Sequence, residues 1–159
     1  MQTGDELRIK EILGQCSEFT DEEVQIAIEL IGIVLNNSSQ LDYVINTAIS
    51  EHGNVVGYYC LGPTSLTIGT YDLYWIAVQP SFHNRGIGKQ LLHHAEDYVI
   101  DRGGRLIIVE TSSQNKYEKT RKFYSRNQYN ELSRIKDYYK IGDDLVTYGK
   151  YVSQFGELN

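Results

Sequence analysis

The junction between a β-rich run and an amphipathic helix constrains the fold of this chain most. It reads "YWIAVQPSFHNRGIGKQLL", residues 74–92, and places Gly86 and Gly88 one residue apart just before the helix. Glycine reaches backbone angles that a side chain forbids, and the first amides of a helix are donors without an intrahelical partner. The junction is therefore either a plain turn or a turn whose amides bind phosphate.

Spacing separates this junction from two other phosphate-binding motifs. A dinucleotide-binding GxGxxG needs a third glycine where Leu91 stands, and a Walker-type loop needs glycine at His83 and Ser or Thr at Gln90. What is left is a short turn whose amides from Arg85 to Lys89 could face a pyrophosphate, with the two cationic side chains adding positive charge.

The pattern of apolar residues predicts a mixed α/β chain of the α+β type, with a central sheet of about six to seven strands flanked by helices. Thr20 and Glu23 form the signature of a capping box. The expected helices are residues 20–37, the segment from the glycine turn to Gly103, and 115–129 with Thr120, Phe123 and Tyr124 turned inward. The expected strands are 8–13 as an edge strand, 43–50 and 55–63 as a hairpin, 71–78, 105–111, 130–139 and 145–153.

Length and charge limit the classes of protein that fit. The 159 residues predict one domain, and the formal net charge of -6 with a pI near 5.2 argues against general nucleic-acid binding. The most apolar window, residues 24–35, is too short to cross a membrane, and the first residues lack the apolar core of a signal peptide. Cys16 and Cys60 are interpreted as reduced thiols of a cytoplasmic protein, with Cys60 packed inside a strand. No metal site is predicted, because His93 and His94 are adjacent and diverge on a helix.

The junction resembles the acetyl-coenzyme A signature of the GNAT superfamily of N-acetyltransferases. In that signature an apolar-Ala-Val strand end precedes a Q/R-x-x-G-x-G/A turn and an amphipathic helix; His83 stands where the family usually has Gln or Arg. Further on, "TRKFYSRNQY" resembles the family's helix motif, which puts Tyr124 at the position of its tyrosine and Tyr117 where many members have Asn. The resemblance covers residues 55–152 and implies the GNAT fold.

The resemblance implies that an amine attacks the acetyl thioester of acetyl-CoA directly. The pantetheine arm would pair with the strand backbone and the pyrophosphate with the turn. The cofactor-binding residues implied in this way are Ile76, Ala77, Val78, Asn84, Arg85, Gly86, Ile87, Gly88 and Lys89. Tyr124 would be the general acid that protonates the departing thiolate; its alternative interpretation is a core tyrosine packed beside Phe123.

Two carboxylates are candidates for the general base. Asp72 falls where histone-type members of the superfamily carry a catalytic glutamate, and it shares a face with Ile76 and Val78 if the strand has no bulge. Glu110 ends the next strand. Each could instead be a carboxylate that caps or pairs, and a reaction without a dedicated base is a third option.

The sequence thus predicts an N-acetyltransferase that moves an acetyl group from acetyl-CoA to a primary amine of a small molecule or peptide. The alternatives are a non-catalytic coenzyme A-binding regulatory module and, less directly, a structural partner-binding domain without cofactor. The loop over residues 61–72 and the helix from Thr20 are expected to line the acceptor site. The surplus of acidic and tyrosine side chains favours a cationic amine, and a homodimer is left open.

Overall fold

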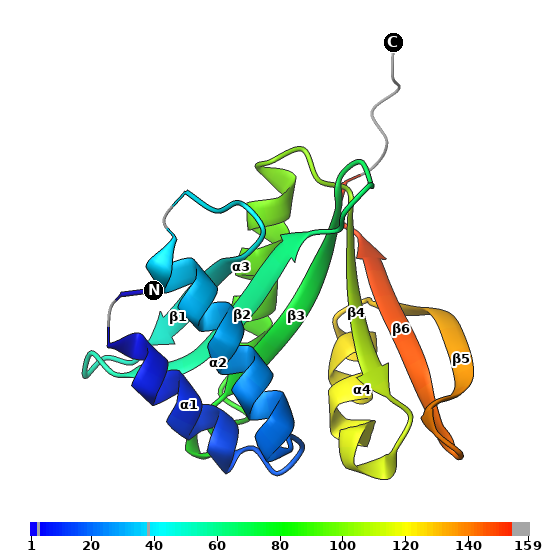
Figure 1. The fold of residues 1–159 in the computed structure, drawn as a ribbon, viewed down its shortest axis with the longest axis horizontal. Helices are drawn as coiled ribbons and strands as arrows, with labels where there is room; N and C mark the ends of the chain where they lie inside the picture. Colours follow the sequence, from blue (N-terminus) through cyan, green and yellow to red (C-terminus); the bar gives the residue numbers. More distant parts are fainter. Residues whose placement is uncertain (3, 38, 154–159) are drawn as a thin grey trace. The chain divides into compact units, whose positions relative to one another are not determined.

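A computed structural model describes residues 1–2, 4–37 and 39–153 (Figure 1). Its helices are α1 Asp5–Gln15, α2 Asp21–Asn36, α3 Ile87–Ile100 and α4 Glu118–Arg126, with short 3₁₀ turns at Pro80–Phe82 and Asn115–Tyr117. Its strands are β1 Val44–Ile49, β2 Val55–Pro63, β3 Thr70–Val78, β4 Leu106–Ser112, β5 Asn130–Lys140 and β6 Asp143–Tyr151. None of the helices in these ranges has the length and apolar character that a membrane span needs.

The strands form one six-stranded sheet in the order β1-β2-β3-β4-β6-β5. The pairs β1–β2, β4–β6 and β5–β6 are antiparallel, and β3 pairs with β4 in parallel from Thr70 opposite Leu106 to Asp72 opposite Ile108. A parallel pair needs a crossover, which α3 supplies. The predicted mixed sheet, the hairpin of β1 and β2, and the strand pair at the end of the chain are confirmed.

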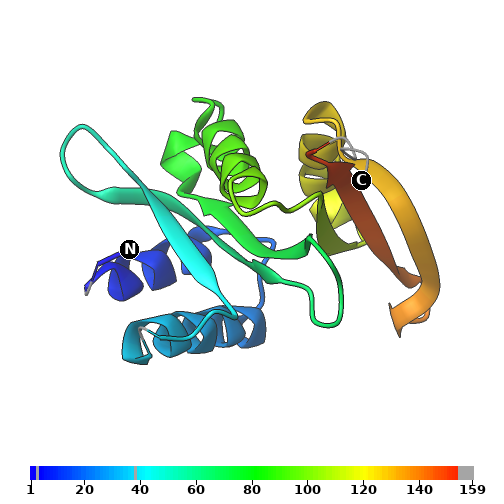
Figure 2. The ribbon, with the colours of Figure 1, turned by 90° about the horizontal axis from the view of Figure 1, so that it is seen from above.

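Contacts between residues divide the chain into two compact units. Unit 1 comprises Met1–Gly62 and Tyr74–Ala95, and unit 2 comprises Pro63–Leu73 and Glu96–Asn159. In unit 1, α1 and α2 cover one face of the β1–β2 hairpin, while α3 begins on the other face (Figure 2).

The prediction of an edge strand over residues 8–13 is wrong, because these residues lie in α1. Ile9, Ile12 and Leu13 recur at the spacing of one helix face, and all three are fully buried. They pack with Ala27 and Ile31 of α2 in the core of unit 1. The six residues 8–13 fit the apolar spacing of a strand as well as that of a helix, and burial of the helical face favours the helix.

The capping box at the start of α2 is confirmed. The Glu23 amide donates to Thr20 Oγ1 at 3.2 Å, and the Thr20 amide donates to Glu23 Oε2 at 2.7 Å. These two bonds satisfy donors that the helix itself leaves open.

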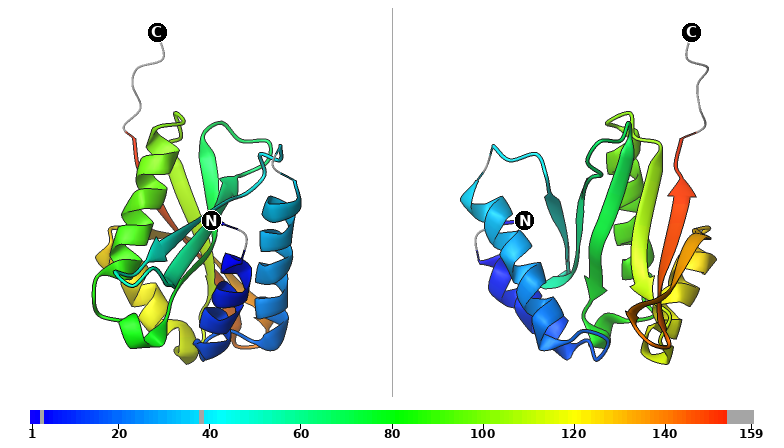
Figure 3. Two further views of the ribbon diagram at one scale, coloured as in Figure 1. Left: turned by 90° about the vertical axis from the view of Figure 1, so that its left-hand side faces the viewer. Right: turned by 45° about the vertical axis from the view of Figure 1, so that its right-hand side comes forward.

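In unit 2, α4 lies against one face of β4 and β6 (Figure 3). The helix predicted over residues 115–129 is too long, since α4 proper ends at Arg126. Asn127 Nδ2 donates to the Phe123 carbonyl at 2.8 Å, and Gln128 has a φ of 70°, a left-handed conformation that ends the helix. Tyr124 is buried as predicted, whereas Thr120 and Phe123 are half-buried.

Both cysteines are buried free thiols, and Cys60 lies inside β2 as predicted. Burial raises the pKa of Cys60 to about 12, and burial together with the charge of Glu18 raises the pKa of Cys16 to about 11. At pH 8 only about one Cys16 thiol in a thousand would be ionised, and the thiolate is the reactive species. We expect Ellman's reagent to leave the native protein unlabelled and to label both thiols in denaturant; rapid labelling of the native protein would contradict this.

Candidate functional site

The turn between β3 and α3 has a backbone conformation that lets a ligand come close to the main chain. β3 ends at Val78, a 3₁₀ turn covers Pro80–Phe82, and α3 begins at Ile87. Asn84 and Gly86 both have left-handed backbones, with φ of 60° and 79°. A Cβ built on Gly86 would meet no atom within 4 Å, so the space above this glycine is open. A ligand can therefore approach the main chain at Gly86 closely.

The charges around this turn favour an anion. The first turn of α3 contains no acidic residue, and its first intrahelical bond runs from the Gln90 amide to the Gly86 carbonyl at 3.0 Å. The preceding amides of the helix have no intrahelical acceptor. Arg85 and Lys89 are exposed, and the Arg85 guanidinium lies 4.8 Å from the centre of the Phe82 ring. Open backbone donors and two cations suit a pyrophosphate.

His83 makes a contact that its position in the motif did not suggest. Its Nε2 lies 2.7 Å from the carbonyl oxygen of Val78, and since a carbonyl only accepts, Nε2 carries the proton. The same peptide group is held from its other side, because the Gln79 amide donates to the Val56 carbonyl at 2.8 Å. The strand end and the glycine turn are thus joined by a side chain.

The alternation of side chains along β3 is interrupted. A Cβ on Gly62 would meet the Tyr74 ring at 3.2 Å, and one on Gly57 would meet Val78 Cγ2 at 3.3 Å. Gly57 and Gly62 are five residues apart on β2, so their Cβ positions lie on opposite faces of the strand. Tyr74 contacts the position at Gly62 and Val78 the one at Gly57, so these two side chains also lie on opposite faces. Regular alternation would put Tyr74 and Val78 on one face. Trp75 packs in the same core as Tyr43, which contacts Tyr74 at 5.4 Å between ring centres.

This irregularity at Tyr74 and Trp75 corrects one expectation. Asp72 alternates with Tyr74 and therefore does not share the face of Ile76 and Val78. The condition attached to that expectation, a strand without a bulge, is not met.

Asp72 and Glu110 lie on one face of unit 2. Asp72 is opposite Ile108 in the parallel register, and Glu110 follows Ile108 by two residues. Burial and the charge of Asp72 raise the pKa of the Glu110 carboxyl. Asp72 Oδ2 accepts a hydrogen bond from Thr64 Oγ1 at 2.7 Å, which ties the β2–β3 loop.

Tyr124 lies in a buried aromatic cluster on the other face of unit 2. Its ring contacts those of Phe123, Tyr129 and Tyr148, with centres 5.4, 5.7 and 6.3 Å away. Tyr148 is opposite Val109 in β4, whereas Glu110 is opposite Thr147, so Glu110 points away from the Tyr124 side. Burial raises the pKa of Tyr124 above its usual value, which keeps the phenol protonated.

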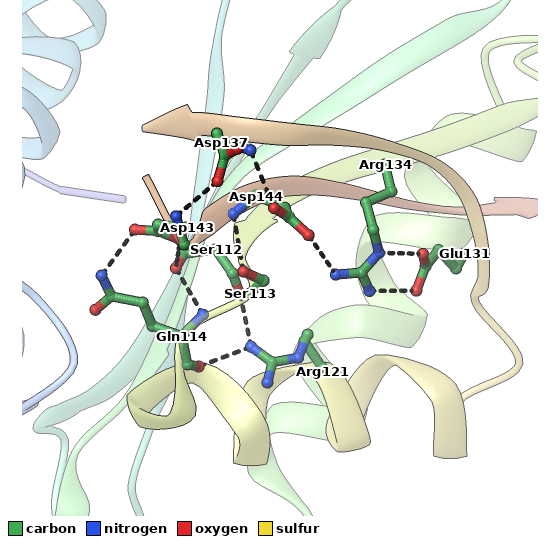
Figure 4. Close-up of polar contacts among 10 residues, drawn as sticks. Ser112, Ser113, Gln114, Arg121, Glu131, Arg134, Asp137, Asp143 and Asp144 are labelled. Carbon is green, nitrogen blue, oxygen red and sulfur yellow. Dashed lines mark hydrogen bonds and ion pairs between the residues drawn. The ribbon is translucent and has the colours of Figure 1, made fainter. Parts of the chain in front are cut away.

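A polar network anchors the start of α4 (Figure 4). Arg121 donates to the carbonyls of Ser112 and Gln114 at 2.6 and 2.9 Å. The buried carboxylate of Asp143 accepts from the Ser112 hydroxyl and from Gln114 Nε2. These bonds fix α4, and with it Tyr124, to the end of β4 and the start of β6. Arg121 lies in the helix predicted over residues 115–129, but no sequence signal singled it out, and no motif pointed to Asp143.

The predicted site residues thus fall into two groups. Unit 1 brings together the backbone of Ile76, Ala77 and Val78 with the turn residues Asn84, Arg85, Gly86, Ile87, Gly88 and Lys89. Unit 2 brings Asp72 beside Glu110 and carries Tyr124 on its opposite face. Their roles in binding and catalysis stay predictions.

Replacing Gly86 by valine tests the role of the turn. The side chain would occupy the open space above the turn, so we expect the Kd for acetyl-CoA to rise by at least about tenfold. Gly53→Val is the matched control, because Gly53 has a φ of 78° and also nothing within 4 Å of its Cβ position. Both variants carry a similar left-handed strain of about 1–2 kcal/mol. Calorimetric titration measures the affinities, and an equal affinity of the two variants would favour the plain turn.

Comparisons with known proteins identify the family and the fold of this chain. Residues 7–128 match the profile of the acetyltransferase (GNAT) family. A crystal structure from Desulfovibrio desulfuricans, assigned to the GNAT acetyltransferases, superposes with a TM-score of 0.89 at 37% identity, over 96% of this chain and 95% of that chain. The PaiA N-acetyltransferase of Thermoplasma acidophilum, solved with coenzyme A, superposes with a TM-score of 0.72 at 18% identity over 95% of each chain.

A curated relative, the uncharacterized N-acetyltransferase YhfO of Bacillus subtilis (strain 168), is 30% identical over 84 residues. The match covers 51% of this chain and 55% of YhfO, so the chain spans about half the length of that relative. The family profile itself covers far more than half of the chain, and the Desulfovibrio structure superposes over nearly all of it. Sequence profile and fold therefore lead to one conclusion: the chain belongs to the GNAT family of acetyltransferases and has the GNAT fold.

Proposed function

We propose that the protein transfers the acetyl group of acetyl-CoA to a primary amine of a small molecule or peptide. The observation that carries this proposal is the turn from Val78 to Lys89, where a strand end, an open glycine and the start of a helix follow one another. The Ile76–Val78 backbone would bind the pantetheine arm. The turn amides and the cations of Arg85 and Lys89 would bind the pyrophosphate.

In the proposed reaction the neutral amine attacks the acetyl carbon directly. The nitrogen–carbon bond forms, the carbonyl oxygen takes up negative charge, and the carbon–sulfur bond then breaks to release the coenzyme A thiolate. The backbone amide near Val78 would stabilise the oxyanion. The Tyr124 phenol would give its proton to the thiolate, a role supported by burial that keeps the group protonated.

Glu110 is the better supported of the two candidate bases. A carboxylate accepts a proton from an ammonium group more readily when its pKa is raised, and burial and the charge of Asp72 raise that of Glu110. Asp72 is engaged by the Thr64 hydroxyl, which supports a role in holding the β2–β3 loop. That loop presents the exposed side chains of Leu66 and Ile68, which could contact an apolar part of the acceptor.

A thermal-shift experiment tests the binding half of the proposal. A ligand that binds only the folded protein at a concentration of 100 Kd stabilises it by about 2.7 kcal/mol. For a chain of this size, we expect saturating acetyl-CoA to raise Tm by several degrees. An unmoved Tm, with an established acetyltransferase shifting in parallel, would overturn the assignment of the turn.

Turnover tests the catalytic half. A panel of amino acids, polyamines and peptide amino termini, followed by release of the coenzyme A thiol, is expected to show at least one acetylated amine. Binding of acetyl-CoA without turnover of any amine would favour the alternative of a coenzyme A-binding regulatory module.

A further inference from the structure

We infer that His83 is a positioning residue for the donor site: its imidazole clamps the Val78 carbonyl and so fixes the pyrophosphate turn relative to the strand end that would hold the pantetheine arm. This inference rests on the proposed function and adds a residue to the same site. The family motif has Gln or Arg at this position, whereas here the His83 imidazole contacts the Val78 carbonyl.

The first support is that both the oxygen and the nitrogen of one peptide group are hydrogen-bonded. The Val78–Gln79 peptide accepts from His83 Nε2 at 2.7 Å through its oxygen and donates to the Val56 carbonyl at 2.8 Å through its nitrogen. Cys16 Sγ lies 3.9 Å from the same oxygen, a weak additional contact. β2 thus holds one side of the junction and His83 the other, so the peptide cannot rotate without losing a bond.

The second support is the conformation of the residues that follow. Asn84 and Gly86 are both left-handed, and a left-handed backbone at a residue with a side chain costs about 1 kcal/mol or more. The residues of the turn from His83 to Gly86 are exposed, so no core packing holds them in this shape. A side-chain bond across five residues offsets that cost and favours the open turn before the ligand arrives.

The third support is the chemistry of the bond. Nε2 must carry the proton, which assigns one tautomer to the neutral ring. The bond ends on the main-chain oxygen of Val78, which Cys16 Sγ also approaches, and not on a side chain. His83 therefore acts through the main chain.

Two amide variants separate this role from general damage. The side-chain nitrogen of glutamine reaches about as far from the backbone as Nε2 of histidine, and that of asparagine only as far as Nδ1. We expect His83→Asn to raise the Kd for acetyl-CoA by about tenfold, the weight of one hydrogen bond to a preorganised site. His83→Gln should stay within about threefold of the wild type. S-acetyl-pantetheine, which lacks the pyrophosphate, should be used equally well by all three proteins.

Calorimetry and steady-state kinetics measure these effects, and ¹⁵N NMR of the ligand-free protein reports the protonated ring nitrogen. If the wild type fails to bind acetyl-CoA, the proposed function is wrong, while the NMR result still decides whether the clamp exists. If the wild type binds but His83→Asn binds equally well, or His83→Gln is as weak as His83→Asn, the clamp has no role in binding. A neutral His83 ring protonated at Nδ1 would overturn the inference outright.

Discussion

Replacing Tyr124 by phenylalanine is expected to lower kcat by about 10²–10⁴-fold, the usual contribution of a positioned proton donor. The ring and its contacts with Phe123, Tyr129 and Tyr148 remain, so stability should change by only about 1 kcal/mol. Affinity for acetyl-CoA should stay near that of the wild type. Single-turnover kinetics with an amine identified by the panel would measure the chemical step.

Tyr129→Phe is the matched control for this experiment. Tyr129 lies in the same cluster and is buried to a similar degree, and its hydroxyl lies beside the carboxylate of Glu96. Removing that hydroxyl should leave kcat unchanged. If the chemical step limits the rate and Tyr124→Phe has the same kcat as the wild type, Tyr124 contributes to packing and is not the proton donor.

Lys150→Met is expected to destabilise the protein by about 3 kcal/mol. Lys150 Nζ lies 2.9 Å from Glu96 Oε2, and the two side chains are only 19% and 11% exposed. The second carboxylate oxygen of Glu96 is buried as well, and the Tyr129 hydroxyl lies beside this carboxylate. Loss of the ammonium would leave a buried charge uncompensated, and urea denaturation measures the change in the free energy of unfolding.

An exposed ion pair provides the control. Lys122 and Glu118 are 2.6 Å apart, one turn apart on α4, and their side chains are 60% and 58% exposed. Lys122→Met should therefore cost no more than about 0.5 kcal/mol. Combining Lys150→Met with Glu96→Leu should restore most of the lost stability, because both charges are then absent. Equal costs for the two lysine variants would show that water reaches Glu96.

Local signals in the sequence predicted several elements well. Thr20 and Glu23 fixed the start of α2 because the capping box acts within one turn. The β1–β2 hairpin and the β3–α3 junction are likewise encoded by neighbouring residues. The first helix was missed because a window of six residues fits two periods, and only packing of Ile9, Ile12 and Leu13 against α2 selects one.

Features that depend on distant residues could not be predicted. The interruption in β3 becomes visible only when Gly57 and Gly62 of β2 show which face each β3 residue occupies. The contact of His83 with Val78 requires the exact path of the turn. Asp143 gave no signal at all, because its partners Ser112 and Gln114 lie about thirty residues earlier in the sequence.

The opposite orientations of Glu110 and Tyr124 in unit 2 have a consequence for proton transfer in the proposed reaction. The backbone of β4 and β6 lies between the proposed base and the proposed acid, so under this proposal the proton removed from the amine would not be the one given to the thiolate. Under the proposal, Glu110 would release its proton on one face of the strands, and the buried Tyr124 would be reprotonated from the other. The acceptor side could then change over evolution, for example by altering Asp72 or the β2–β3 loop, without disturbing how the coenzyme A thiol is released.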